Sequence, residues 1–468
     1  MIHAIVVKFP RDVLDEQSKT FFLHLVACLA NDNDDIVCSM SGATIKKLIG
    51  SVSSSALKPI LKYALSWYSG DKQQLWAAAT QVLGLLIEVV KNEFLSHIDY
   101  ILPVTHCILQ SAIHVVTNRQ KSFESESNLP LWKEAYYSLV MLGKIIHQFH
   151  DLCFTKELEG IWEAICEMLL HPHSWLRNKS GRLIALYFAR VTDNNRENHQ
   201  SSLNSHFMMS PSRLYLIATS LCCQLKMPLI DEVDSILMTQ NIVFAFFALM
   251  RQTASIDPSA FWSTLEQNKK NRFLKAFDLI NARKGRMMFM SSSLTSSVCE
   301  GGSQVNVKNT QQILVSLLLK KMGKIALQTD AIQMEIVFNS FGKLMAQIEM
   351  SMDYAHIVLI PLYKVSEGFA GKVVAGNLKK LAEDTCGKIE NIIGTQNFVQ
   401  VYNLIRKNLS LKRNKRKPKT GTLPQSPYAT DPAWSDSLWK ILQVTWDDPD
   451  LVTNTKRLNP PSNFLKVR

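Results

Sequence analysis

The sequence predicts an all-α fold, built as a helical-repeat solenoid and followed by a disordered basic C-terminal tail. Three observations carry this prediction: apolar residues recur at helical spacing along most of the chain, strand-type alternation is scarce, and two tryptophan-containing stretches resemble each other. The 468 residues exceed the roughly 250–300 at which single cores stop growing. Because 47% of the residues are apolar, the composition is that of a folded protein.

Amphipathic stripes are the first of these observations. Residues 75–86 place apolar side chains at the i, i+3, i+4 and i+7 positions of a half-buried helix. Similar stripes recur at 21–29, 57–67, 131–146, 158–170, 175–191, 214–225, 236–250, 313–326, 334–345 and 398–405. Several starts carry helix-capping residues, namely Asp71, Thr155, Ser210-Pro211 and Asp257-Pro258. We therefore expect helix after helix.

A short internal repeat favours a solenoid over a bundle. Residues 75–83 and 131–139 share the pattern Leu-Trp-x-x-Ala-x-x-x-Leu. Residues 174–183 match less well, because Asn178 replaces the alanine and Leu183 falls one place late.

The tryptophans of these stretches are Trp76, Trp132 and Trp175, which stand 56 and 43 residues apart. The second interval fits the ~40–47-residue period of HEAT and armadillo repeats, and the first fits it with an inserted loop. We expect each tryptophan to pack between neighbouring repeats. The alternative is that each is an ordinary core residue of an unrepeated helical domain.

Changes in composition predict the domain organisation. We expect HEAT-like helical repeats over 1–283, a flexible Ser/Gly-rich linker over 284–309 and further helical repeats over 310–409. The tail over 410–468 is basic and Pro-rich, and we expect it to be mostly disordered. Residues 192–210 are polar and predict a surface loop inside the first block.

The charge is concentrated near the C-terminus, just after Lys407, where the helical pattern fails. The net charge is +12, and residues 406–419 contribute +8 of it without a single acid. These cations are Arg406, Lys407, Lys412, Arg413, Lys415, Arg416, Lys417 and Lys419. Residues 412–415 fit a nuclear-import pattern, and such runs also bind nucleic-acid phosphates. The alternative is a merely solvated tail.

A second basic cluster precedes the expected linker. Its members are Lys269, Lys270, Arg272, Lys275, Arg283, Lys284 and Arg286. A solvated helix face explains the cluster, and a phosphate-contacting surface is the functional alternative.

Catalytic and cofactor motifs are not found. The sequence holds no GxxxxGK[ST], GxSxG or HExxH, and its nine cysteines are irregularly spaced without a CxxC pair, which indicates reduced thiols. The best metal candidate is His147-x-x-His150-x-x-Cys153, to which Asp151 could add a further ligand, but no second ligand pair accompanies it. We expect no enzyme activity, no metal or other cofactor and no small-molecule substrate. Because no secretory signal or membrane span is visible, we also expect no membrane association.

Four stretches of the sequence resemble a known family, the small nucleolar RNA-associated protein 20 family of the small-subunit processome. They are residues 13–32, 65–68, 74–86 and 171–177, and the resemblance covers roughly residues 1–409. The family's proteins are several times longer, and the chain resembles only a C-terminal part of them. Residues 420–468 fall outside it.

The resemblance implies a nucleolar, non-enzymatic scaffold that assists assembly and processing of the precursor of small-subunit ribosomal RNA. Its implied partners are pre-ribosomal RNA and processome proteins, and its implied location is the nucleolus or nucleus. A nuclear transport or adaptor solenoid that binds only proteins is the alternative.

Overall fold

A computed structural model gives the structure of the chain. It describes residues 2–31, 35–69, 72–118, 129–197, 207–227, 232–254, 310–348, 351–370 and 375–416, with a few more positions between 256 and 263. The described residues contain helices and no strand, as the sequence predicts. The chain divides into two units, the first formed by 1–274 and 306–405 and the second by 275–305 and 406–468; of the second, the structure describes only 406–416.

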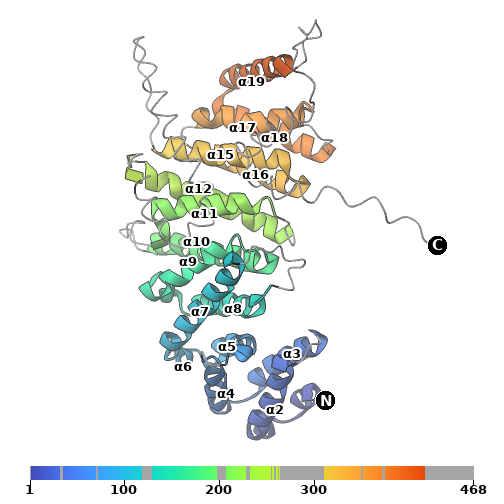
Figure 1. Ribbon diagram of the computed structural model, residues 1–468, viewed down its shortest axis with the longest axis vertical. Coiled ribbons are helices and arrows are strands. Elements are labelled where there is room, and N and C mark those ends of the chain that lie inside the picture. The colour runs from blue at the N-terminus through green and yellow to red at the C-terminus, as the bar shows by residue number, and fades with distance from the viewer. Residues whose placement is uncertain are drawn as a thin grey trace, which may run out of the picture. The chain divides into compact units, whose positions relative to one another are not determined.

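Helices follow one another along the first unit, coloured from blue to orange in Figure 1. The N-terminal ones are α1 (Ile2–Lys8), α2 (Arg11–Asn31), α3 (Asp35–Ser51), α4 (Ser54–Trp67), α5 (Trp76–Val90), α6 (Asn92–Leu95), α7 (Ile98–Asn118), α8 (Trp132–Gln148) and α9 (Glu159–Met168). The later ones are α10 (Ser174–Glu197), α11 (Pro211–Gln224), α12 (Glu232–Thr253), α15 (Thr310–Gln328), α16 (Ala331–Gln347), α17 (Ser351–Ser366), α18 (Gly376–Ile393) and α19 (Thr395–Arg416).

Helices of the first unit pack in two rows. In one row α3, α5, α8, α10, α12, α16 and α18 each contact the next, and in the other α7 contacts α9 and α11 contacts α15, which contacts α17. Arg213 of α11 reaches Glu163 of α9, and so links these two parts of the second row. Neighbours in the chain, such as α11 with α12 and α17 with α18, pack across the rows. This stacked arrangement is the one that a helical-repeat array requires.

Helix α4 shows how the sequence produces one element. Its buried residues Leu57, Ile60, Leu61 and Ala64 follow the i, i+3, i+4, i+7 spacing, so one face turns to the core. Ser53 caps the helix by accepting the Ala56 amide hydrogen at 3.4 Å. The predicted apolar stripe is therefore confirmed here.

Helix α5 is the most apolar element. Residues Gln73–Val90 form the one stretch of the described chain that is long and apolar enough to cross a membrane by composition. Its first three residues form a 3₁₀ turn, which leaves α5 with 15 residues, fewer than the ~20 that a bilayer needs. Trp76, Ala79 and Leu83 are buried in the array, so α5 is one of its core helices.

The prediction of a loop over 192–210 is wrong at both ends of that range. Helix α10 continues to Glu197, and a 3₁₀ turn at Phe207–Met209 buries Met208 and Met209. The polar composition of 192–197 predicts a loop, but polar composition alone does not exclude a helix, and α10 includes these residues. Two methionines at the end of the expected loop belong to the core.

The helical pattern also ends later than the sequence predicts. Helix α19 continues past Lys407 to Arg416, into the segment expected to be disordered. Lysine and arginine favour helix formation, and cations near a helix C-terminus are stabilised by the helix dipole. The prediction relied on apolar periodicity, which reflects neither helix propensity nor the helix dipole. The expected linker at 284–309 lies outside the described residues.

Candidate nucleic-acid interface

The three repeat tryptophans all lie near the start of a helix. Trp76, Trp132 and Trp175 lie in the first turn of α5, α8 and α10, which are successive helices of one row. Trp76 is buried, and its indole N–H donates to the Ser69 carbonyl at 2.9 Å. Trp76 is therefore buried, as both the repeat alignment and an ordinary core position predict.

Trp175 does not pack as expected, since 49% of it is exposed, and Trp132 is only half-buried. The buried place in the first turn of α10 belongs to Leu176. Leu176 stands seven residues before the buried Leu183, as Trp76 stands before Leu83. The repeat register in α10 is therefore shifted by one residue, and the tryptophan is displaced to the surface.

The turn between α9 and α10 is fixed by two buried histidines and a buried arginine. His171 Nδ1 accepts the His173 amide hydrogen at 3.0 Å, and His173 Nδ1 accepts that of Trp175 at 3.2 Å. Arg177 donates to the His171 carbonyl at 2.9 Å and to the carbonyl of Pro172. The histidines thus line the turn between two helices.

Aromatic rings gather where α8 and α10 begin. Trp132 stacks on His173 with ring centroids 4.3 Å apart and meets Trp175 edge-on at 5.8 Å. Tyr136 lies 5.5 Å from Trp175, and the Lys133 ammonium is 5.7 Å from the Trp132 ring. We call Trp132, Tyr136, His173 and Trp175 the aromatic cluster.

Further along the same two helices is a cavity of about 310 Å³. Basic side chains line it from both helices, Lys144 and His147 from α8 and Lys179 and Arg182 from α10. The carboxylate of Glu88 on α5 also lines it. We call this cavity the α8–α10 hollow. Sequence reasoning missed it, because its cations come from stretches more than thirty residues apart.

Two of the cations have partners in the fold. Lys144 donates to the Gly84 carbonyl at 2.7 Å and lies 3.3 Å from Glu88, whose side chain is 61% exposed. Arg182 lies 3.0 Å from the buried Asp234 carboxylate, while half of its own side chain remains exposed.

Lys179 is placed differently from these two. It is half-buried, and within the described part of the chain no carboxylate pairs with it. Burial lowers its pKa, and the nearby charges of Arg182 and Lys144 lower it further. A Cβ on Gly143 would lie 3.7 Å from its Nζ, so the ammonium reaches across to α8.

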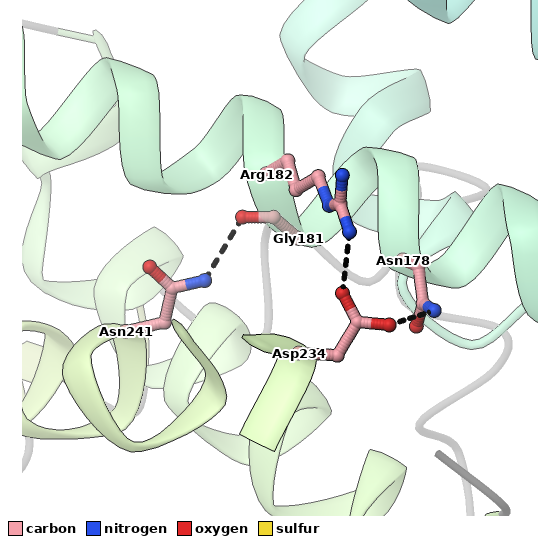
Figure 2. Close-up of polar contacts among 5 residues, drawn as sticks. All are labelled: Asn178, Gly181, Arg182, Asp234 and Asn241. Carbon is pink, nitrogen blue, oxygen red and sulfur yellow. Dashed lines mark hydrogen bonds and ion pairs between the residues drawn. The ribbon is translucent and has the colours of Figure 1, made fainter. Parts of the chain in front are cut away.

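A polar junction joins α10 to α12 beside the hollow (Figure 2). Asp234 accepts hydrogen bonds from both Arg182 and Asn178, and Asn241 donates to the Gly181 carbonyl at 2.9 Å. The carboxylate side chain is only 5% exposed, so these bonds replace its lost hydration. The junction holds the Arg182 end of the hollow in place.

The basic residues singled out in the sequence lie at the end of α19 or outside the described residues. Arg406 and Lys407 are exposed on α19, and the helix also includes Lys412, Arg413, Lys415 and Arg416. Lys417 and Lys419 lie outside the described residues. So does the whole second cluster of Lys269, Lys270, Arg272, Lys275, Arg283, Lys284 and Arg286.

The metal candidate does not assemble in the described chain. The His147 and His150 rings are 6.0 Å apart, and burial raises the pKa of the Cys153 thiol to about 12. Among the described residues, no three His, Cys, Asp or Glu side chains are grouped to hold a metal.

Fold and surface together define a class, an all-α array of stacked helices whose surface carries cationic and aromatic groups. Comparison with known proteins is more specific. The chain is 24% identical over 246 residues, or 52% of its length, to U3 small nucleolar RNA-associated protein 20 of Schizosaccharomyces pombe. It is 19% identical over 426 residues, 90% of its length, to the protein of the same name in Saccharomyces cerevisiae. These matches confirm the family resemblance seen in the sequence.

The chain spans only a small part of these relatives, 10% of the first and 15% of the second. A short stretch of 40 residues, 8% of the chain, is 48% identical to auxin response factor 8 of Oryza sativa subsp. japonica. No family model matches the chain.

Proposed function

We propose that the chain is a non-enzymatic, HEAT-type scaffold of the small-subunit processome that assists assembly and processing of the small-subunit ribosomal RNA precursor. The observation that carries the proposal is similarity over 90% of the chain to a protein named for its association with U3 small nucleolar RNA. The two rows of helices support a scaffold role, because stacked repeats offer long continuous surfaces to partners. Its proposed partners are pre-ribosomal RNA and processome proteins.

The basic segment 406–419 is the proposed RNA contact and nuclear-import signal. Its eight cations carry no acid among them, and the first two are exposed on α19. Phosphate contacts of this kind bind RNA without reading its sequence. Import through this segment would bring the chain to the nucleus and nucleolus.

The test replaces five of these cations, Lys412, Arg413, Lys415, Arg416 and Lys417, with Gln. If all eight wild-type cations meet phosphates on one strand, log affinity falls against log salt with a slope of about −5 to −6. The variant should bind single-stranded RNA more weakly, with a slope smaller in magnitude by up to about 3.5. Fluorescence anisotropy across a salt series measures both. Melting should be unchanged, because the four substitutions at 412–416 lie at the end of one helix and glutamine favours helices about as well as lysine.

The matched control removes the same charge from exposed positions of the first unit, with Gln at Lys46, Lys47, Lys62, Lys379 and Lys380. It should bind RNA nearly as well as the wild type. Sequencing of RNA crosslinked to the chain in cells should recover small-subunit precursor RNA. If it recovers no RNA and the five-Gln variant matches the wild type in binding and localisation, an adaptor solenoid that binds only proteins is supported instead.

A further inference from the structure

We infer that the face along which α8 and α10 lie side by side binds single-stranded RNA, with a backbone phosphate in the α8–α10 hollow and a base against Trp175. This inference rests on the proposed RNA-binding function and adds a second contact, within the first unit. Neither basic segment predicted from the sequence includes it.

The charges around the hollow suit one phosphate group. Lys144, Lys179 and Arg182 bring three positive charges, while Glu88 and Asp234 bring two negative ones. These five charges sum to +1, which balances the single negative charge of a phosphodiester. The volume of about 310 Å³ is several times the ~30 Å³ share of one water molecule, so a hydrated phosphate fits.

Lys179 is the residue that points most directly to an anion. Its ammonium is half-buried beside Lys144 and Arg182, and its pKa is lowered first by burial and then by repulsion from these two charges. In the shifted register of α10, Lys179 stands three residues after Leu176, where the two other repeats bury Ala79 and Ala135. A lysine in this position is unfavourable, because the other repeats have a small residue there and because Lys144 and Arg182 repel its charge. A bound anion would offset that repulsion and so explains why a lysine is present.

The aromatic cluster lies within reach of the same strand. Trp175, Lys179 and Arg182 stand at i, i+4 and i+7 of α10, so they share one face, and two turns, about 10.5 Å, separate the first from the last. Trp175 is 49% exposed and is held by Trp132 and Tyr136, so its ring is fixed but accessible. Exposed aromatic faces beside cations are typical of single-strand binding, since bases stack on them. An acidic peptide would use the cations but would have no use for the ring.

The experiment uses the full chain and a labelled 12-nucleotide oligouridine RNA, with Lys179→Gln as the first variant. If Lys179 contacts one phosphate, Lys179→Gln should weaken binding about threefold to tenfold and reduce the magnitude of the salt slope by about 0.7. Its melting temperature should stay the same or rise, because a buried repulsion is removed. Lys46→Gln, which removes an exposed charge from α3, should leave RNA affinity nearly unchanged.

The second pair of variants tests the base contact. Trp175→Ala should weaken binding about fivefold or more while leaving the salt slope unchanged, because stacking releases no counterions. Trp175→Phe keeps an aromatic face and should restore most of the affinity.

The two proposals fail in different ways. If the wild type binds RNA but Lys179→Gln and Trp175→Ala bind it equally well, the α8–α10 inference is overturned and the proposed function stands. A loss seen only for an oligoglutamate peptide also overturns the inference, in favour of a protein partner. If the wild-type chain binds no RNA at all, both are overturned.

Discussion

A shift of the repeat register by one residue separates a buried side chain from one on the proposed RNA-binding surface. In α5 a tryptophan occupies the buried place of the first turn, whereas in α10 that place belongs to Leu176 and Trp175 faces outward. The sequence carried a sign of this, because Leu183 falls one position late in the alignment. The poorer match of residues 174–183 to the repeat pattern is therefore a shift in register.

The register shift predicts unequal stability effects for two neighbouring residues. Leu176→Ala should lower the free energy of unfolding by about 2–5 kcal/mol, because it leaves a cavity around a fully buried site. Trp175→Ala should cost less, despite the larger side chain, because half of that residue is already in water. Urea unfolding of the two variants measures the difference. A larger loss of unfolding free energy for Trp175→Ala than for Leu176→Ala would contradict the register shift and support the unshifted alignment.

The α8–α10 hollow could not be predicted from the sequence, although its helices could. Lys144 and Lys179 belong to different predicted stripes, and only the packing of α10 beside α8 brings them to one cavity. One signal was present in the sequence, since a lysine occurs where aligned repeats carry alanine. It becomes visible only once the register of α10 is known.

At the scale of elements, apolar periodicity identified most of the helices and misplaced some ends. The predicted stripes correspond to α2, α4, α5, α8, α9, α10, α11, α12, α15, α16 and α19. The helices not predicted were α1, α3, α6, α7, α17 and α18. Two of these, α7 and α17, contain an internal proline, at Pro103 and Pro361, which weakens the helical signal. Helix ends were hardest to predict, because α10 and α19 finish in polar residues without a stripe.

The junction between α10 and α12 predicts a rescue. Arg182→Ala leaves the buried Asp234 carboxylate with a partner fewer, and should cost about 1–3 kcal/mol of unfolding free energy. Adding Asp234→Asn removes the buried charge, so the double variant should be more stable than Arg182→Ala alone. Thermal unfolding of the two single variants, the double variant and the wild type forms a complete double-mutant cycle. A double variant less stable than both single ones would contradict this account.

At the scale of the first unit, stability should vary along the rows. Each helix packs mainly on neighbours in its row and pair, so a helix inside the array has partners on more sides than one at its end. Central helices such as α8 and α10 carry many fully buried side chains, whereas α19 exposes much of its surface. Such arrays open from their ends more readily than from their middle.

Native-state hydrogen exchange tests this gradient. Amides in α8, α9 and α10 should exchange most slowly, and those in α1 and α19 fastest, under conditions in which exchange reports opening. The five-Gln variant should leave the protection of α8–α10 unaltered, which serves as the internal control. Uniform protection along the first unit would instead indicate one cooperative block.

The pairing of helices with their neighbours in the chain also bears on how the protein is made. Pairs such as α2 with α3 and α11 with α12 need no distant residue to form, so most native contacts join segments close in sequence. Chains with local contacts fold fast, in microseconds to milliseconds for small helical domains, whereas synthesis adds about 5–20 residues per second. Each pair therefore has time to fold while the next is still being translated. The helices can then be added to the array in the order of their synthesis, which leaves little apolar surface exposed to solvent at any stage.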